Sequence, residues 1–164
     1  MRLIFAALLL FPTIIWACSI PPQTLYQSNE QLVRSTPVIT LAKVENREGD
    51  GKYNQYEFTF KSTLSLKGKA PDTFILIGYE ASNVSEAPAD FGDHKKPEFW
   101  AFDSGNTIQP GDCTAYGLFS VGQEYLIFLR PKSHYRSYEN IKQNDDLWLE
   151  VVQLLIEYEK RQPY

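Results

Sequence analysis

Cysteine, histidine and positive charge are all scarce in this 164-residue chain. It has two cysteines, two histidines, and 16 Lys and Arg against 20 Asp and Glu, for a formal net charge of −4 at pH 7. Nucleic-acid-binding proteins usually carry a concentrated basic face, so this acidity argues against a nucleic-acid partner. Binding to a membrane surface through charge is unsupported for the same reason.

A long apolar run is also missing. The longest one, residues 3–15, is shorter than the roughly 20 residues that span a bilayer. Arg2 before it and the small Ala17 after it are typical of a secretory signal peptide. We therefore expect residues 1–17 to be removed and residues 18–164 to form one exported domain, secreted or periplasmic, without a transmembrane helix.

The two cysteines gain meaning from this expected export. Cleavage after Ala17 makes Cys18 the first residue of the mature chain, and Cys113 is the only other cysteine. A pair of cysteines is readily bridged in an oxidising compartment, which predicts a Cys18–Cys113 disulfide. Two alternatives stay open. Both thiols could be free, or Cys18 could carry a lipid anchor, because residues 15–18 partly resemble a bacterial lipobox. A lipidated Cys18 cannot form the bridge.

The residues that are plentiful favour a mainly β fold with flanking helices. Aromatic residues make up 14% of the chain, which suits a β-rich core. Helical spacing of apolar residues predicts a helix over residues 23–34 and another from a cap at Asn144 or Asp145 to about Lys160. Strands are expected at residues 38–44, 56–66, 73–79, 113–119 and 124–129.

The clearest alternation lies in the second of these strands. One face carries its apolar side chains, namely Tyr56, Phe58, Phe60, Leu64 and Leu66. The third strand is apolar on both faces, so we expect it to be central. Closure removes exposed sheet edges, and these elements therefore predict a five-stranded OB-type barrel with an N-terminal and a C-terminal helix.

Several short motifs, in their order along the chain, resemble a known family. These are Cys18 at the mature N-terminus, Pro22 and Gln23 before a helix, the strand at residues 38–44, the Leu-Lys-Gly ending at residue 68, and Cys113 followed by residues 119–128. The pattern resembles the netrin-like domain of tissue inhibitors of metalloproteinases and its bacterial relatives. This resemblance implies an OB-type barrel, with Cys18–Cys113 matching the family's bridge from the first residue to the barrel.

The same resemblance implies an inhibitory site at the mature N-terminus. In these inhibitors the N-terminal cysteine chelates the protease zinc through its amino group and carbonyl oxygen, and the next residue enters the substrate pocket. Cys18 and Ser19 would fill these two roles. However, the family has a second cysteine where this chain has Ile20. Inhibition of a metalloprotease is therefore an alternative to a more general role in protein interaction.

A long irregular segment, residues 81–112, is the main candidate for binding a partner. Loops of this length in a compact domain are usually functional or partly disordered. The segment carries four large aromatic residues, Phe91, Phe99, Trp100 and Phe102. If exposed they would form an apolar patch of the kind that marks partner sites, and otherwise they would pack over the barrel end as a satellite core.

Nothing in the sequence has the spacing of a catalytic or metal site. Asp90, Asp93 and His94 could form a loop metal site, but the two lysines that follow favour a solvated surface. His134 lies in a polar, Tyr-rich loop and is expected to have no role. No phosphate-binding loop, nucleophile elbow or metalloprotease helix is present. The sequence thus predicts an exported domain without enzymatic activity, metal or cofactor, which binds a protein partner such as an extracellular or periplasmic metalloprotease.

Overall fold

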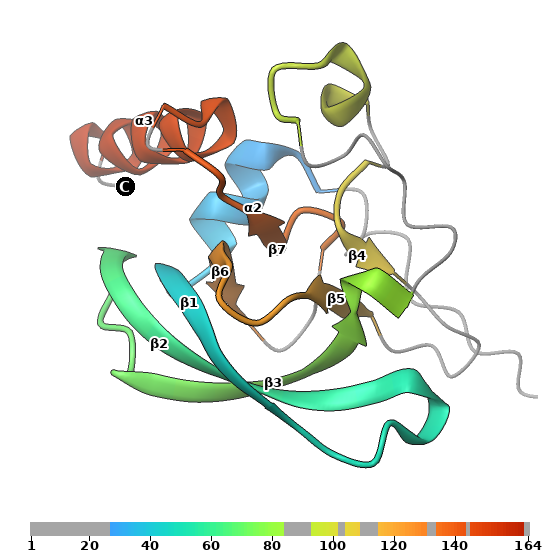
Figure 1. Ribbon diagram of the computed structural model, residues 1–164. Helices are drawn as coiled ribbons and strands as arrows, with labels where there is room; N and C mark the ends of the chain where they lie inside the picture. Colours follow the sequence, from blue (N-terminus) through green and yellow to red (C-terminus); the bar gives the residue numbers. More distant parts are fainter. Residues whose placement is uncertain are drawn as a thin grey trace, which may run out of the picture.

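The computed structural model describes residues 27–83, 93–101, 104–108, 115–130, 134–143 and 145–162, and these form a mainly β structure with two helices (Figure 1). The helices are α2 (Asn29–Ser35) and α3 (Leu147–Arg161). The strands are β1 (Val38–Glu48), β2 (Gln55–Lys67), β3 (Thr73–Glu80), β4 (Thr107–Ile108), β5 (Tyr116–Phe119), β6 (Glu124–Leu129) and β7 (Tyr138–Asn140). They make one seven-stranded sheet in the order β4-β5-β3-β2-β1-β6-β7. Of the described strand pairs, only β3 with β5 is parallel.

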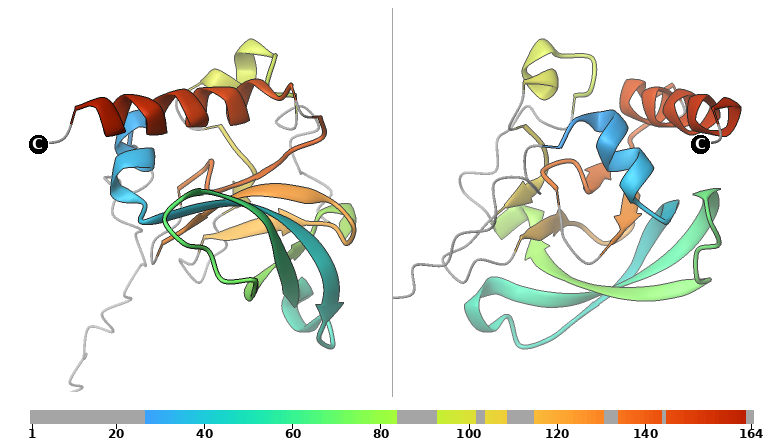
Figure 2. Two further views of the ribbon diagram at one scale, coloured as in Figure 1. Left: turned by 90° about the vertical axis from the view of Figure 1, so that its left-hand side faces the viewer. Right: turned by 180° about the vertical axis from the view of Figure 1, so that it is seen from behind.

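The sheet coils because its longest strands pair irregularly. The ladder between β1 and β2 shifts register between Ile39 and Thr40, between Leu41 and Ala42, and again after Val44. Each such bulge bends the strand and increases its twist. The sheet therefore curls round into a barrel-like shape (Figure 2).

In the described residues, the two ends of the sheet are joined by the side chain of Glu139 and a backbone hydrogen bond, without a strand ladder. Asn106, next to β4, donates from its backbone N and its Nδ2 to the two carboxylate oxygens of Glu139 on β7, at 2.9 and 2.8 Å. The backbone N of Thr107 donates to the carbonyl oxygen of Tyr135 at 3.1 Å. The barrel is thus nearly closed, and the β4–β7 seam depends on the buried carboxylate of Glu139.

Side chains on the two faces of the sheet form two cores. On β6, Tyr125 and Ile127 point into the barrel, whereas Leu126 and Phe128 point towards the helices. Inside the barrel, the Phe119 ring covers the paired glycines Gly78 and Gly117, where an added Cβ would come within 2.5 and 2.3 Å of that ring. The absence of side chains at these two positions is what lets Phe119 pack inside.

The second core lies between the sheet and the helices. It includes Leu32 and Val33 of α2, with Trp148, Leu149, Val152 and Ile156 of α3. Both helices lie on the same side of the barrel (Figure 2, left). The helix expected over residues 23–34 begins only at Asn29 in the described residues, because Ser28 is its extended N-cap and forms a capping box with Gln31. The cap of α3 is Asp146, one or two residues later than expected.

Several strand predictions hold and others need correction. β6 spans residues 124–129 as predicted, but β1 continues to Glu48, four residues beyond the predicted end at residue 44. β4 and β7 were not predicted, because they are only two and three residues long. The described part of the chain therefore has seven strands where five were expected. Two predicted parts lie outside the described residues. They are the start of the first helix, residues 23–26, and the signal peptide, residues 1–17.

The predicted buried face of β2 is correct for Phe58 and Phe60 and wrong for Leu64, which is half exposed. Ala42 pairs with Ser62 and Leu41 with Leu64, so Thr63 is an extra residue in β2. One extra residue reverses which side chains face inward beyond it. In the described residues, no helix is both long and apolar enough to span a membrane.

Candidate functional site

The most concentrated polar chemistry in the described residues lies where segment 93–101, β7 and the start of α3 meet. A 3-10 helix, Pro97–Trp100, positions the segment by burying Phe99 completely in the helix-side core. The half-buried Trp100 packs on the same core, and its Nε1 donates to the carbonyl oxygen of His94 at 2.9 Å. These two aromatic anchors hold His94 with its side chain turned inward.

His94 lies between two carboxylates. Its Nδ1 is 2.7 Å from both carboxylate oxygens of Asp146, and its Nε2 is 3.5 Å from Oε2 of Glu139. Oδ1 of Asp146 also caps α3 by accepting from the backbone N of Trp148 and of Leu149. The side chains of His94 and Glu139 are both buried. The imidazole of His94 therefore links the start of α3 to β7, one of the two strands at the seam.

The two carboxylates determine the charge of this imidazole. Burial alone lowers the pKa of His94, but hydrogen bonding to Asp146 and Glu139, together with their negative charges, outweighs burial and raises the pKa to about 9. Burial raises the pKa of Glu139, against the opposing effects of His94, Asn106 and Arg136. His94 is thus an imidazolium at neutral pH, which makes it unsuited to act as a general base.

A buried arginine ties the same segment to α2. Nη1 of Arg136 donates to Oδ1 of Asn29 at 2.8 Å, and its Nη2 donates to the carbonyl oxygens of Phe99 and Ala101 at 2.7 and 2.6 Å. The guanidinium also lies 5.0 Å above the centre of the Phe99 ring. Since the side chain contacts α2 and the 93–101 segment at once, removing it would uncouple the two.

The second histidine, His134, is also buried but is neutral rather than positively charged. Its Nε2 donates to the carbonyl oxygen of Gln27 at 3.0 Å, and its Nδ1 accepts from the backbone N of Arg136 at 3.2 Å. Burial lowers the pKa of His134 to about 4; the hydrogen bond to Gln27 opposes this shift, and the charges of Arg136 and Arg130 add to it. His134 is therefore neutral at neutral pH and fixes the chain just before α2.

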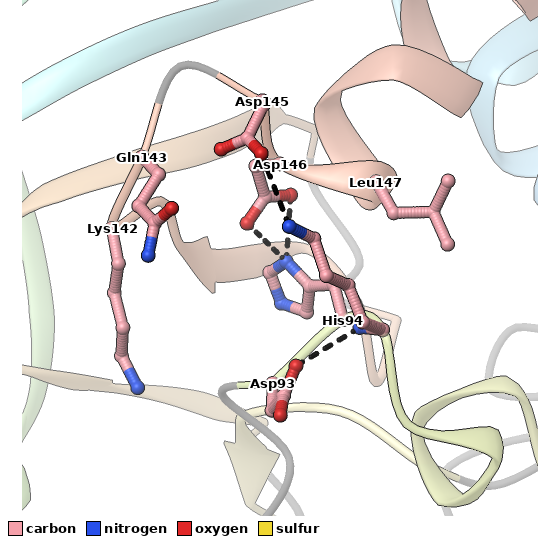
Figure 3. Close-up of a pocket in the computed structure, with 8 residues that line it drawn as sticks. Asp93, His94, Lys142, Gln143, Asp145, Asp146 and Leu147 are labelled. Atoms are coloured by element: carbon pink, nitrogen blue, oxygen red, sulfur yellow. Dashed lines mark hydrogen bonds and ion pairs between the residues drawn. The ribbon is translucent and has the colours of Figure 1, made fainter.

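A surface cavity of about 360 Å³ lies beside this cluster (Figure 3). It is lined by Asp93, His94, Lys95, Lys142, Gln143, Asp145, Asp146 and Leu147. Figure 3 shows Lys142 and Gln143 across the cavity from His94 and Asp146. Charges of both signs surround it, and Nζ of Lys95 is 3.1 Å from Oδ2 of Asp145. Within the described ranges, no three His, Cys, Asp or Glu residues are grouped as a metal site would need.

The structure places only some of the residues that the sequence singled out. Outside the described residues lie Cys18, Ser19, Asp90, Phe91, Phe102 and Cys113. Of the predicted aromatic binding loop, Phe99 is buried and Trp100 half-buried, as in the satellite-core alternative. The side chain of Phe99 is therefore unavailable to a partner, and the binding role of the loop stays a prediction.

The sequence places His94 on the solvated surface, and this prediction is wrong. The lysine after His94 does point outward, but His94 itself turns inward because Asp146 and Glu139 accept its charge. His134 is fully buried and holds Gln27.

The sequence alone does not reveal Arg136 and Glu139 as members of this cluster. The one signal available was their position within a Tyr-rich segment that predicts partial burial. Their partners lie 33 to 107 residues away in the chain, so spacing could not reveal the contacts.

No family model matches the chain, and no curated protein is significantly similar to it. The resemblance to netrin-like domains therefore rests on the sequence motifs alone.

Proposed function

We propose that this protein is an exported, non-catalytic domain that binds another protein. The observation that carries the proposal is an exposed apolar surface on the outer face of β3. Ile75 and Ile77 are 59% and 51% exposed. They lie two residues apart on one face of the strand, and their cross-strand neighbours on β2 are Thr59 and Glu57. We call Ile75, Ile77 and the nearby Tyr53 the sheet patch.

Tyr53 extends the sheet patch to the tip of the β1–β2 hairpin. Tyr53 and Ile77 both line a groove of about 490 Å³. Tyr53 and Asn54 have φ angles of 59° and 61°, in the left-handed region that residues other than glycine rarely adopt. Such a conformation costs on the order of 1–3 kcal/mol, and strained positions of this kind concentrate at functional sites. A strained turn that presents an exposed tyrosine supports a binding role for this surface.

The charges around the groove indicate the chemistry of the partner. Glu48, Asp50 and Glu57 line it, against the single positive charge of Lys52. An apolar surface with an acidic rim suits a protein segment whose apolar side chains are flanked by Lys or Arg. Salt should weaken such binding, because it screens the charges at the rim.

The charge states of the histidines support the absence of catalysis. The chain has two histidines, and neither pKa lies near neutrality, at about 9 for His94 and about 4 for His134. Each also has a hydrogen-bond partner within the fold. Neither therefore suits proton transfer at neutral pH.

The test compares Ile77→Asp with Val121→Asp, which also replaces a half-exposed apolar residue with the same charge, but in the β5–β6 turn. Purified mature proteins serve as bait for exported proteins of the source cells. We expect a partner to bind the unmodified protein and Val121→Asp, to be lost with Ile77→Asp, and to be released by salt. Equal retention by all three proteins would contradict the proposal. Trp100→Ala is a poor probe, since Trp100 packs on Phe99 and Trp148.

The alternatives at the mature N-terminus rest on residues outside the described ranges. A zinc-chelating wedge at Cys18 and Ser19 predicts that one added Ala before Cys18 abolishes inhibition of a metalloprotease. A lipid anchor at Cys18 excludes both that wedge and the bridge to Cys113. For the fold, we propose that β1, β2, β3, β5 and β6 are the strands of an OB-type barrel, with β4 and β7 as short additions at the seam.

A further inference from the structure

Helix α3 carries a second apolar row besides the one that it buries. The buried row is Trp148, Leu149, Val152 and Ile156. The second row is Leu147, Val151, Leu154 and Tyr158. Leu154 and Tyr158 are 58% and 49% exposed, and Leu147 and Val151 are half-buried. Packing within the described fold leaves Leu154 and Tyr158 facing solvent.

The spacing of the second row is that of a helix-pairing surface. Its members follow one another by four, three and four residues, which is the spacing of the a and d positions in a coiled coil. The exposed Glu150, Gln153 and Glu157 border the row on its polar side. Side chains in this arrangement fit between those of a second helix, so the row is suited to a helical partner.

The row and its flanking charges are complementary to a second copy of themselves in the antiparallel direction. In that arrangement Leu147 faces Tyr158 of the second copy, and Val151 faces its Leu154. The start of α3 carries Asp145, which also pairs with Lys95 of its own chain at 3.1 Å, and its last turn carries Lys160 and Arg161, so these two basic side chains approach Asp145 of the second copy. A parallel pair would bring like charges together instead.

A repulsive contact accompanies this arrangement and occurs twice by symmetry. Glu157 approaches Glu150 of the second copy, although Arg161 of its own chain lies 3.5 Å from Glu157 and offsets its charge. Four side chains per helix bury less than the roughly 1,600 Å² of a standard protein interface. The association should therefore be weak and concentration-dependent.

We propose that this protein self-associates through antiparallel pairing of α3 with α3 of a second copy. α3 and β3 lie on opposite sides of the molecule (Figure 1), so the pairing leaves the sheet patch uncovered. The proposal is independent of the proposed function, because the two involve different surfaces and different variants.

The test is sedimentation equilibrium of the mature protein at low salt, from micromolar to several hundred micromolar. We expect the mass to rise from one copy to two over this range. Leu154→Glu should raise the dissociation constant at least tenfold. Gln153→Glu is the matched control, because it adds the same charge at the neighbouring exposed position of the same helix and should leave the association intact. Circular dichroism checks that both variants are folded.

A second variant tests the direction of the pair. Lys160→Glu combined with Arg161→Glu should weaken an antiparallel dimer, and adding Asp145→Lys to the same chain should restore it. A parallel pair would not show this weakening and rescue, and such a result would overturn the antiparallel assignment. A mass of one copy throughout, or an equal loss of association in Gln153→Glu, would overturn the proposal itself.

Discussion

At the scale of single residues, His94 and His134 are both buried, but at neutral pH His94 is positively charged and His134 is neutral. His94 has a carboxylate near each ring nitrogen, from Asp146 and Glu139. His134 has a backbone carbonyl on one side, a backbone N–H on the other and two arginines nearby. The partners, rather than the depth of burial, therefore determine which histidine carries a proton.

These environments predict that stability falls on both sides of about pH 6.5. The pKa of His134 is about 4 when folded, below its ordinary value of 6.5, so the unfolded chain takes up a proton first and stability falls as the pH drops from 6.5 to 4. The pKa of His94 is about 9 in the folded protein, above its ordinary value of 6.5. The stabilisation from protonated His94 is therefore fully present below pH 6.5 and is lost as the pH rises to 9. Each shift corresponds to roughly 3 kcal/mol. Urea denaturation between pH 4 and 9 measures both effects.

Single substitutions assign each effect to its residue. His134→Gln should flatten the acid side of the stability profile and leave the alkaline side. His94→Gln should leave the acid side and remove the part of the alkaline fall that belongs to His94, while the raised pKa of Glu139 causes a remaining fall of the same sign. His94→Gln should also lower stability at pH 7 by about 3 kcal/mol or more, because it removes the positive partner of a buried carboxylate. A profile whose two sides persist in both variants would contradict the assignment.

At the scale of the elements, the β4–β7 seam requires a residue without a side chain at Gly105. A Cβ there would lie 2.0 Å from the carbonyl oxygen of Tyr135 and 2.8 Å from Oε1 of Glu139, and φ is +149°. Gly105→Ala should therefore lower the free energy of unfolding by about 2 kcal/mol or more. Gly122→Ala is the control, since Gly122 has a φ of +85° but no atom within 4 Å of an added Cβ. Equal losses in the two variants would mean that the seam is not crowded at Gly105.

Local signals predicted the elements whose contacts are local. The capping box of Ser28 and Gln31, the extent of β6 and the inward faces of Phe58 and Phe60 could all be derived from spacing within a few residues. The candidate site could not be derived in this way, because His94 meets a carboxylate 52 residues away. β4 and β7 are too short for a periodic pattern, and the extra residue at Thr63 has no sequence signature.

At the scale of the whole molecule, the expected disulfide determines how the mature N-terminus is held. We predict that the exported protein begins at Cys18 and has a mass two hydrogens below that of the reduced chain. Because a Cys18–Cys113 bridge closes a long loop, its reduction should lower the free energy of unfolding by up to about 4–5 kcal/mol. Intact mass before and after reduction and alkylation tests this, with Cys113→Ser as the control. Two thiols that react without reduction would refute the bridge, and an added diacylglyceryl group would indicate the lipid anchor instead.

The way the barrel closes has a consequence for its motions. A ladder between strands holds many amides at once, whereas the hydrogen bonds reported across the β4–β7 seam in the described residues involve Asn106, Glu139 and a backbone bond to Tyr135. Opening there breaks few bonds and lets water solvate the carboxylate of Glu139, so it should require less free energy than global unfolding. In deuterium exchange, the amide of Thr107 should therefore lose its protection well before that of Val44. The barrel would then open repeatedly along one line while β1, β2 and β6 stay paired.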